Sequence, residues 1–332
     1  MSKFQAEDGT LKVGDTFRVS FHRTLRVPDD GKVYPLPPSL GTFPLHRVSK
    51  FTGRTPAHWD RKRGFFFPLY QREALWLSFD GPYWKPNALK VGVGQVSSIT
   101  GEAWNEELHA EPQDYLVCPN QPWLDGYKTE AGIVRQYVAV PLGEGYTVSE
   151  QISGPGGGEL RLVVIEPRPG RFPDKPPADQ GPIGVAFSAP SPAIQEMGLA
   201  AGGKIEQKIY PDPYGLETWD SNRSTLLSVY LVNNLDYELI TGEPPPPTPI
   251  DASLYTRYGF PWFKLYDEER GDIEANQALQ DVRPVHEMDA ATRKEKDPAD
   301  ASFEIKPEQV KDIGPEFRRK SSPGKTESRS KP

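Results

Sequence analysis

The chain has 332 residues, of which 36% are hydrophobic, with 36 prolines, 30 glycines and one cysteine, Cys118. Its net charge of −7 argues against a general nucleic-acid surface, because neutralising phosphates requires a basic field. A single cysteine excludes an internal disulfide and suits a reducing compartment. No apolar run reaches the roughly 20 residues of a membrane helix, and no signal-peptide pattern opens the sequence. These features predict a cytoplasmic protein without a membrane span, with leaderless secretion left open.

Several segments alternate apolar and polar side chains with a period of two, which is typical of half-buried strands. Gly92 and Gly94 occupy alternate positions in one of them and predict the close approach of another backbone or a ring. The segment 122–126, PWLDG, is predicted to be a turn that precedes a hairpin. Strands are predicted at 16–25, 65–79, 88–100, 133–141, 146–152, 159–165, 204–210 and 224–232.

Helix signals are few and short. Ser191 and Pro192 open a predicted helix over 191–201, since serine caps and proline suits the first helical position. Asp251 is the predicted N-cap of a second helix, 252–258, which Gly259 would close. A single helical turn is a further candidate at 102–109. The sequence therefore predicts two or three short helices.

These elements predict a mainly β body over residues 10–272, an antiparallel β-sandwich-like fold. Eight prolines between 166 and 192 leave open whether the body divides near 170–190. Beyond about residue 283, aromatic residues become rare and charged residues alternate with Pro, Ser and Lys. The segment 283–332 is therefore predicted to be a disordered charged tail that is dispensable for folding.

Four strings of the sequence resemble those of a set of uncharacterised bacterial and fungal proteins. The strings are QDYLVCPNQPWLDG, VRQYVAVPLGEGYTV, QKIYPDPYG and PWFKLYDE. The resemblance covers most of residues 10–272 and implies that the body is one recurring unit. It implies no activity, ligand or catalytic residue.

Motifs for metals, nucleotides and nucleophilic catalysis are missing from the sequence. The five histidines lack the short spacings of metal sites, and the glycine runs lack the frame of phosphate-binding loops. The S-x-x-K match of Ser322 with Lys325 falls in the predicted tail, where a rigid site cannot be built. We therefore predict no metal and no cofactor.

The candidate binding surface consists of an aromatic turn and the strand that follows it. Trp123 and Asp125 belong to the turn, Arg135 and Gln136 to the strand, and Tyr146 to the next segment. An aromatic ring beside hydrogen-bonding groups can receive a sugar face or a peptide. The sequence thus predicts a non-catalytic binding or structural-interaction module for a protein or carbohydrate ligand. In the alternative interpretation, Trp123 fills the core and Arg135 pairs with Asp125.

A second hypothesis of a different class is a carboxylate-dependent glycoside hydrolase. Such enzymes need two carboxyl groups held about 5 to 9.5 Å apart, which loop spacing cannot establish. Solvated acidic loops are the alternative explanation for the clusters. The candidate carboxylates are Asp212, Glu217, Asp220, Asp267 and Asp272.

Overall fold

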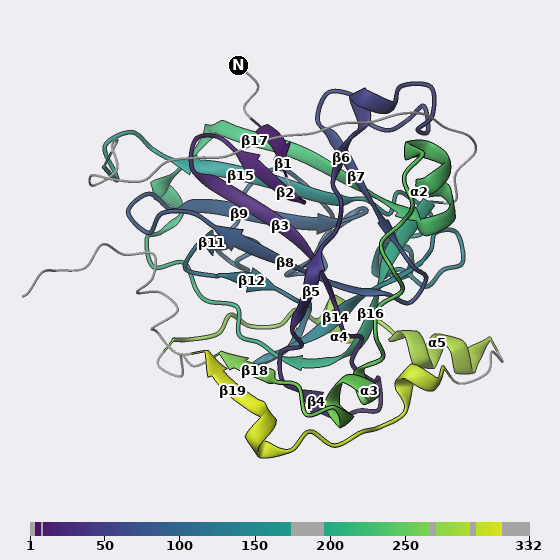
Figure 1. The fold of residues 1–332 in the computed structure, drawn as a ribbon. Helices are drawn as coiled ribbons and strands as arrows, with labels where there is room; N and C mark the ends of the chain where they lie inside the picture. Colours follow the sequence, from purple (N-terminus) through teal and green to yellow (C-terminus); the bar gives the residue numbers. More distant parts are fainter. Residues whose placement is uncertain (1–3, 8, 174–195, 266–269, 293–296, 314–332) are drawn as a thin grey trace, which may run out of the picture.

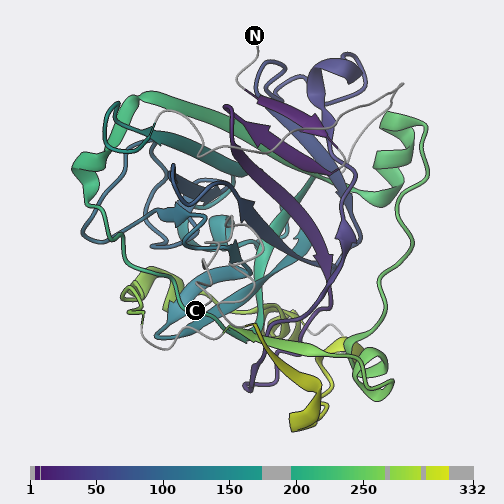
Figure 2. The same ribbon diagram turned by 60° about the vertical axis from the view of Figure 1, so that its left-hand side comes forward.

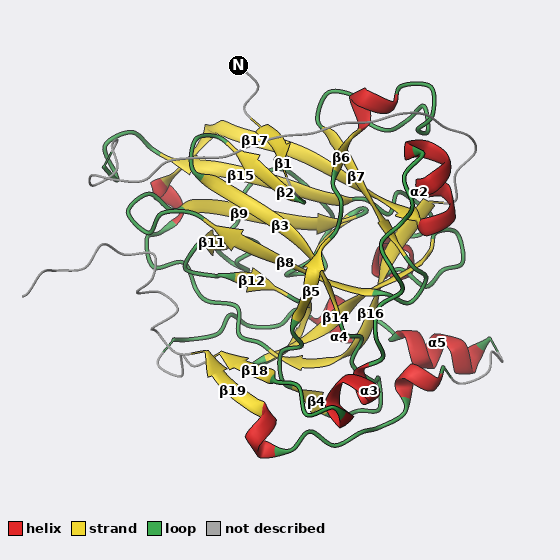
Figure 3. Ribbon diagram, in the orientation of Figure 1, coloured by secondary structure: helices red, strands yellow, loops and turns green. Residues whose placement is uncertain are grey.

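The computed structural model describes residues 4–7, 9–173, 196–265, 270–292 and 297–313. Strands dominate it, and the helices are short pieces at the periphery of the sheet (Figure 3). The predicted mainly β, antiparallel fold is confirmed. The described residues contain five α-helices, more than the two or three expected.

Seventeen of the described strands form one large sheet, and β18 and β19 form a small parallel pair. The strands are β1 (Phe4–Glu7), β2 (Thr10–Val13), β3 (Phe17–Thr24), β4 (Val33–Tyr34), β5 (Ser39–Thr42), β6 (His46–Arg47), β7 (Gly64–Leu69), β8 (Ala74–Asp80), β9 (Asn87–Val93), β10 (Val96–Ser97), β11 (Leu116–Cys118), β12 (Trp123–Leu124), β13 (Gly126–Glu130), β14 (Ile133–Pro141), β15 (Leu160–Pro167), β16 (Glu196–Glu206), β17 (Trp219–Asn233), β18 (Trp262–Leu265) and β19 (Val310–Ile313). The helices are α1 (Val148–Ser153), α2 (Asn234–Thr241), α3 (Ala252–Arg257), α4 (Gln277–Gln280) and α5 (Val285–Ala291), with 3-10 turns at Val48–Phe51, Leu216–Thr218, Pro298–Asp300 and Pro307–Gln309.

Antiparallel neighbours run through most of the sheet in the order β1, β2, β3, β8, β14, β16, β17, β15, β9, β11. One large core cluster takes side chains from distant members of this run, including Phe21 of β3, Val91 of β9 and Leu162 of β15. The sheet therefore folds over its own core in a sandwich-like manner, as Figures 1 and 2 show from two sides.

The strongest local signals gave the right elements. The predicted strand 133–141 is β14, Ile133–Pro141, with the predicted bounds. Asp251 caps α3 through a hydrogen bond from the Leu254 N–H to its carboxylate at 3.0 Å, and Gly259 follows in the left-handed region with φ of 79°. The strands predicted at 65–79 and 88–100 are each divided into two by a turn.

Four predicted elements are wrong, and tertiary pairing explains two of them. The expected turn at 122–126 contains strand β12, because Trp123 and Leu124 pair with Ser78 and Leu77 of β8. Residues 196–201 of the expected helix 191–201 belong to strand β16, which is paired with β14 and β17, whereas residues 191–195 lie outside the described part of the chain.

The helical turn considered at 102–109 is not formed, and Ala103 makes an isolated bridge with Val96. The strand predicted at 204–210 is formed only as far as Glu206, the end of β16.

The expected strand 146–152 is helix α1. Thr147 and Glu150 form a reciprocal capping box: the Glu150 N–H donates to Thr147 Oγ1 at 3.0 Å, and the Thr147 N–H donates to the Glu150 carboxylate at 3.1 Å. Two otherwise unsatisfied donors are paired in this way, which favours a helix start. The T-x-x-E spacing of Thr147 and Glu150 is the signal in the sequence for this helix start, and the strand prediction did not take it into account.

The segment predicted as a tail from residue 283 contributes ordered structure. Helix α5 buries Val285 and Met288, and Arg26 of the body binds Asp297 at 2.5 Å and Asp300 at 2.7 Å. Residues 283–292 and 297–313 are therefore part of the described fold, which corrects the expectation of a tail over these residues; residues 314–332 lie outside the described residues.

The proposed division near 170–190 falls mainly on residues 174–195, outside the described part of the chain. The strands on its two sides, β15 and β16, both pair with β17.

Gly92 is the position where a ring approaches the backbone, as its spacing predicted. A Cβ atom there would lie 2.3 Å from the Trp104 ring, a distance that real contacts do not reach. We expect Gly92→Ala to lower the free energy of unfolding by roughly 1–3 kcal/mol through overpacking. Thermal denaturation checks this, with Gly81→Ala as control because its added Cβ finds only ordinary contacts at 3.7 Å or more. Equal losses in the two variants would contradict the explanation.

Candidate functional site

Two of the predicted binding residues are buried structural groups. Gln136 is fully buried in β14, where its amide donates to the Leu25 carbonyl at 2.9 Å and accepts from the Val27 N–H at 3.0 Å. Asp125 is 2% exposed and accepts a hydrogen bond from the Gln207 amide at 2.7 Å. Burial raises the pKa of Asp125 to about 7. Neither side chain faces a ligand-accessible surface.

Arg135 and Tyr146 also bind within the protein. Arg135 pairs with Asp29 at 2.9 Å, so the alternative pairing with Asp125 is not the one formed. The Tyr146 hydroxyl donates to Asp289 of α5 at 2.8 Å. The five predicted residues therefore do not converge on one surface.

Trp123 is partly exposed, as is Arg135, but unlike Arg135 it forms no ion pair. It packs against the core and meets the Trp76 ring edge-on, with the ring centroids 6.4 Å apart. Trp76 in turn stacks on His22 at 4.0 Å. Burial lowers the pKa of His22 to about 4, so its imidazole is neutral at physiological pH and shares hydrogen bonds with Ser39 and Ser78. These residues lie on the outer face of the sheet.

Two carboxylates named in the hydrolase hypothesis hold the fold together. Asp212 accepts hydrogen bonds from the Tyr115 hydroxyl at 2.6 Å, the Trp219 indole at 2.9 Å and the Tyr214 N–H at 2.7 Å. Asp272 binds the buried ammonium group of Lys128 and two backbone N–H groups. Their oxygens are occupied by the protein itself.

The other three carboxylates do not complete a site. Glu217 is exposed and lies 3.8 Å from Arg171, and Asp220 accepts from the N–H of Asn222, two residues further along β17. Asp267 lies outside the described residues.

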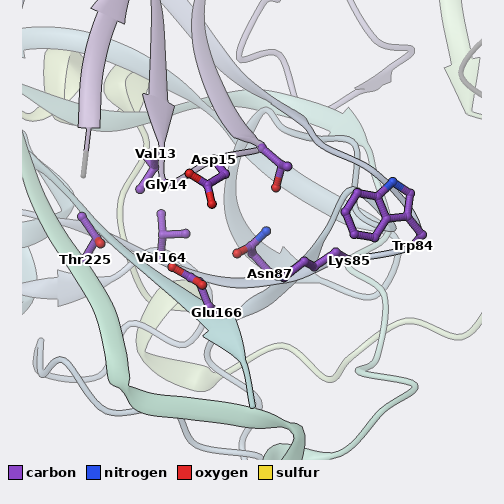
Figure 4. Close-up of a pocket in the computed structure, with 10 residues that line it drawn as sticks. Val13, Gly14, Asp15, Trp84, Lys85, Asn87, Val164, Glu166 and Thr225 are labelled. Atoms are coloured by element: carbon purple, nitrogen blue, oxygen red, sulfur yellow. The ribbon is translucent and has the colours of Figure 1, made fainter. Parts of the chain in front are cut away.

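A pocket of about 180 Å³ opens at one end of the sandwich, between the β2–β3 turn, the start of β9, the end of β15 and the middle of β17 (Figure 4). Three of these strands carry an inward-facing apolar row that changes to a polar residue at the pocket. The rows are Leu160, Leu162, Val164 and then Glu166 on β15; Leu231, Val229, Leu227 and then Thr225 on β17; and Val93, Val91, Leu89 and then Asn87 on β9.

Asn87 is the most informative side chain in this pocket. It is 5% exposed, it lines the pocket, and within the described residues its amide has no hydrogen-bond partner. The amide is not among the side-chain atoms that are both sealed from water and unpaired, so it is open to the pocket. It is therefore available to hydrogen-bond a molecule that enters the pocket.

The rest of the lining is polar around an apolar floor. Figure 4 shows the carboxylates of Asp15 and Glu166 directed into the pocket, with Trp84 at its side. Glu166 is ion-paired with Arg223, whereas Asp15 is exposed and has no partner among the described residues. Val13 and Val164 close the inner end.

Sequence reasoning missed this pocket, although part of its signal was local. A period-two apolar row that ends in Asn, Glu or Thr is visible in each strand, but only the strand pairing brings the three ends together. Within the described residues, no three His, Cys, Asp or Glu side chains gather as a metal-binding group. No helix in the described ranges has the length and apolar character needed to cross a membrane.

Comparison with known proteins yields no relative. No family model matches the chain, and neither a curated protein nor a solved structure matches it.

Proposed function

We propose that this protein is a non-catalytic binding module for a small polyhydroxylated ligand, of the carbohydrate class, held in the pocket at the end of the sandwich. The observation that carries the proposal is the amide of Asn87, which is held in the pocket wall, is open to the pocket and has no partner within the described residues. An amide donates and accepts at once, which matches a pair of neighbouring sugar hydroxyls, each of which can also do both.

The remaining lining supports the same class of ligand. Trp84 offers an aromatic ring to the apolar face of a sugar ring, and Asp15 and Thr225 offer hydrogen-bonding oxygens. Two carboxylates against one lining lysine, Lys85, disfavour phosphate groups and other anions. The volume of about 180 Å³ is below the roughly 300–1,000 Å³ of drug-sized ligand pockets and suits one ring at a time.

Asn87→Ala tests the proposal. We expect it to weaken binding of a sugar ligand about 10- to 100-fold, the equivalent of roughly 1–3 kcal/mol of lost hydrogen bonding. The melting temperature should stay nearly unchanged, because within the described residues the amide forms no hydrogen bond that the variant could remove. Calorimetry against monosaccharides, with differential scanning of each variant, measures both effects.

The control for this experiment is Asn222→Ala, which removes an exposed amide on β17. Unchanged sugar affinity in Asn87→Ala, or no monosaccharide binding by the parent protein, would refute the pocket as a sugar site.

A glycoside hydrolase is the second candidate, because Asp15 and Glu166 line one pocket. The hydrolase is less well supported than the binding module. Hydrolysis needs one carboxyl group that keeps its proton, and desolvated surroundings are what raise its pKa enough for that. Glu166 is instead paired with Arg223, and Asp15 is exposed. Release of reducing ends that disappears in Asp15→Asn and Glu166→Gln would favour the enzyme; sugar binding without release favours the module.

A further inference from the structure

A row of polar side chains crosses five neighbouring strands on the outer face of the sheet. The strand register places Glu7 of β1 beside Thr10 of β2, Thr10 beside Ser20 of β3, Ser20 beside Ser78 of β8, and Ser78 beside Trp123 of β12. β2, β3, β8 and β12 run side by side across the front of Figure 1. Four steps at the usual strand spacing of about 4.8 Å make this row roughly 19 Å long.

The chemistry of the row combines a carboxylate, three hydroxyls and an aromatic ring. Thr10 and Ser20 share a hydrogen bond of 2.8 Å, which leaves each hydroxyl with further donor or acceptor capacity. Trp76 lies beside the row and meets Trp123 edge-on. Aromatic rings beside hydroxyl groups are suited to sugar rings, which have apolar faces and polar edges.

Two polar atoms at this face lack partners. Glu7 Oε1 and Trp76 Nε1 are shielded from water, and neither has a hydrogen bond within the described part of the chain. An unpaired acceptor and an unpaired donor each cost free energy. Because both atoms are sealed from solvent, a ligand can contact only the partly exposed remainder of these two side chains.

The row and the pocket are joined through one turn. Thr16 lines the pocket, and on the outer side of β3 it is followed by Arg18 and then Ser20. Four residues of extended chain separate Thr16 from Ser20 by roughly 14 Å. The exposed ion pair of Arg18 with Asp80, at 3.3 Å, lies between them.

We propose that the ligand is a linear oligosaccharide with one terminal ring in the pocket. Its further rings follow β3 to Ser20, at the middle of the row, and continue from there over Ser78 toward Trp123. This inference rests on the proposed function, and it adds that the protein selects chain length. A single ring fills the pocket, whereas only a chain reaches both the pocket and the row.

Calorimetry with linear glucan, xylan and mannan oligomers of one to six units tests the inference. The parent protein should bind a four-unit chain at least tenfold more tightly than its monosaccharide. Trp123→Ala should lose that gain while keeping the monosaccharide affinity, and Asn87→Ala should weaken binding at every length.

Because Trp123 also packs on the core, Thr10→Val is the second variant. It keeps the side-chain shape and removes a row hydroxyl, and it should lose part of the gain, whereas the exposed Thr52→Val should lose none. The oligosaccharide inference is overturned if affinity does not depend on the length of the sugar chain. It is also overturned if both row variants still bind the chain as much more tightly than the monosaccharide as the parent does. Neither outcome contradicts the pocket proposal. Absence of binding to every sugar in the panel overturns both.

Discussion

A chain ended after Arg283 is expected to melt roughly 10 °C lower than the full chain. The truncation removes Asp297 and Asp300 from Arg26, whose side chain is only 7% exposed, and Asp289 from Arg72. Removing one side of a buried ion pair costs roughly 3–5 kcal/mol, because the remaining charge stays buried without compensation. The loss of α5 adds the exposure of the apolar surface that it covers.

Thermal denaturation of two truncated chains distinguishes this stabilising segment from a dispensable one. A chain ended after Ile313 keeps every contact named above, and we expect it to melt within a few degrees of the full chain. Asp300→Ala isolates the Arg26 pair and should reproduce part of the loss. Equal melting of the full chain and the chain ended at Arg283 would show that these contacts contribute nothing.

Asp125→Asn is expected to stabilise the protein above neutral pH. The folded protein raises the pKa of Asp125 from 3.8 to about 7, so the folded form keeps a proton that the unfolded chain releases above about pH 4. Stability therefore falls as pH rises from about 4 to about 7, and the deficit persists above pH 7. Three pKa units correspond to roughly 4 kcal/mol, which the neutral asparagine avoids.

Urea denaturation at pH 4, 6 and 8 measures this effect. The difference between Asp125→Asn and the parent should be small at pH 4 and reach several kcal/mol at pH 8, since the asparagine oxygen still accepts from Gln207. Asp80→Asn is the control, because its carboxylate is 71% exposed and its effect should not change between pH 6 and 8. A pH-independent difference for Asp125→Asn would show that the carboxyl group is ionised in the folded protein.

The C-terminal segment shows where composition misleads. Few aromatic and many charged residues after position 283 indicated disorder, because such sequences bury little apolar surface. In the folded protein, those same charges stabilise the segment, since Asp297 and Asp300 meet a buried arginine 271 and 274 residues away. Sequence distance of this size hides the partner.

Local chemistry determined the elements whose signals act within a few residues. Alternating apolar side chains determined β14, and the cap by Asp251 determined α3, since both act through neighbouring backbone. The strand in place of a turn at Trp123 required β8 as a partner. Of the predicted binding residues, Asp125, Arg135, Gln136 and Tyr146 became internal partners of distant groups.

The sequence by itself determined a mainly β chain with antiparallel strands, because hydrophobic periodicity is a property of each segment alone. Only the tertiary structure decided which residues line the pocket. Asn87, Glu166 and Thr225 come from three strands and meet only after the sheet has paired and folded over its core. Strand register is set by long-range burial and pairing. No single segment therefore determines which polar residues will lie together in one pocket.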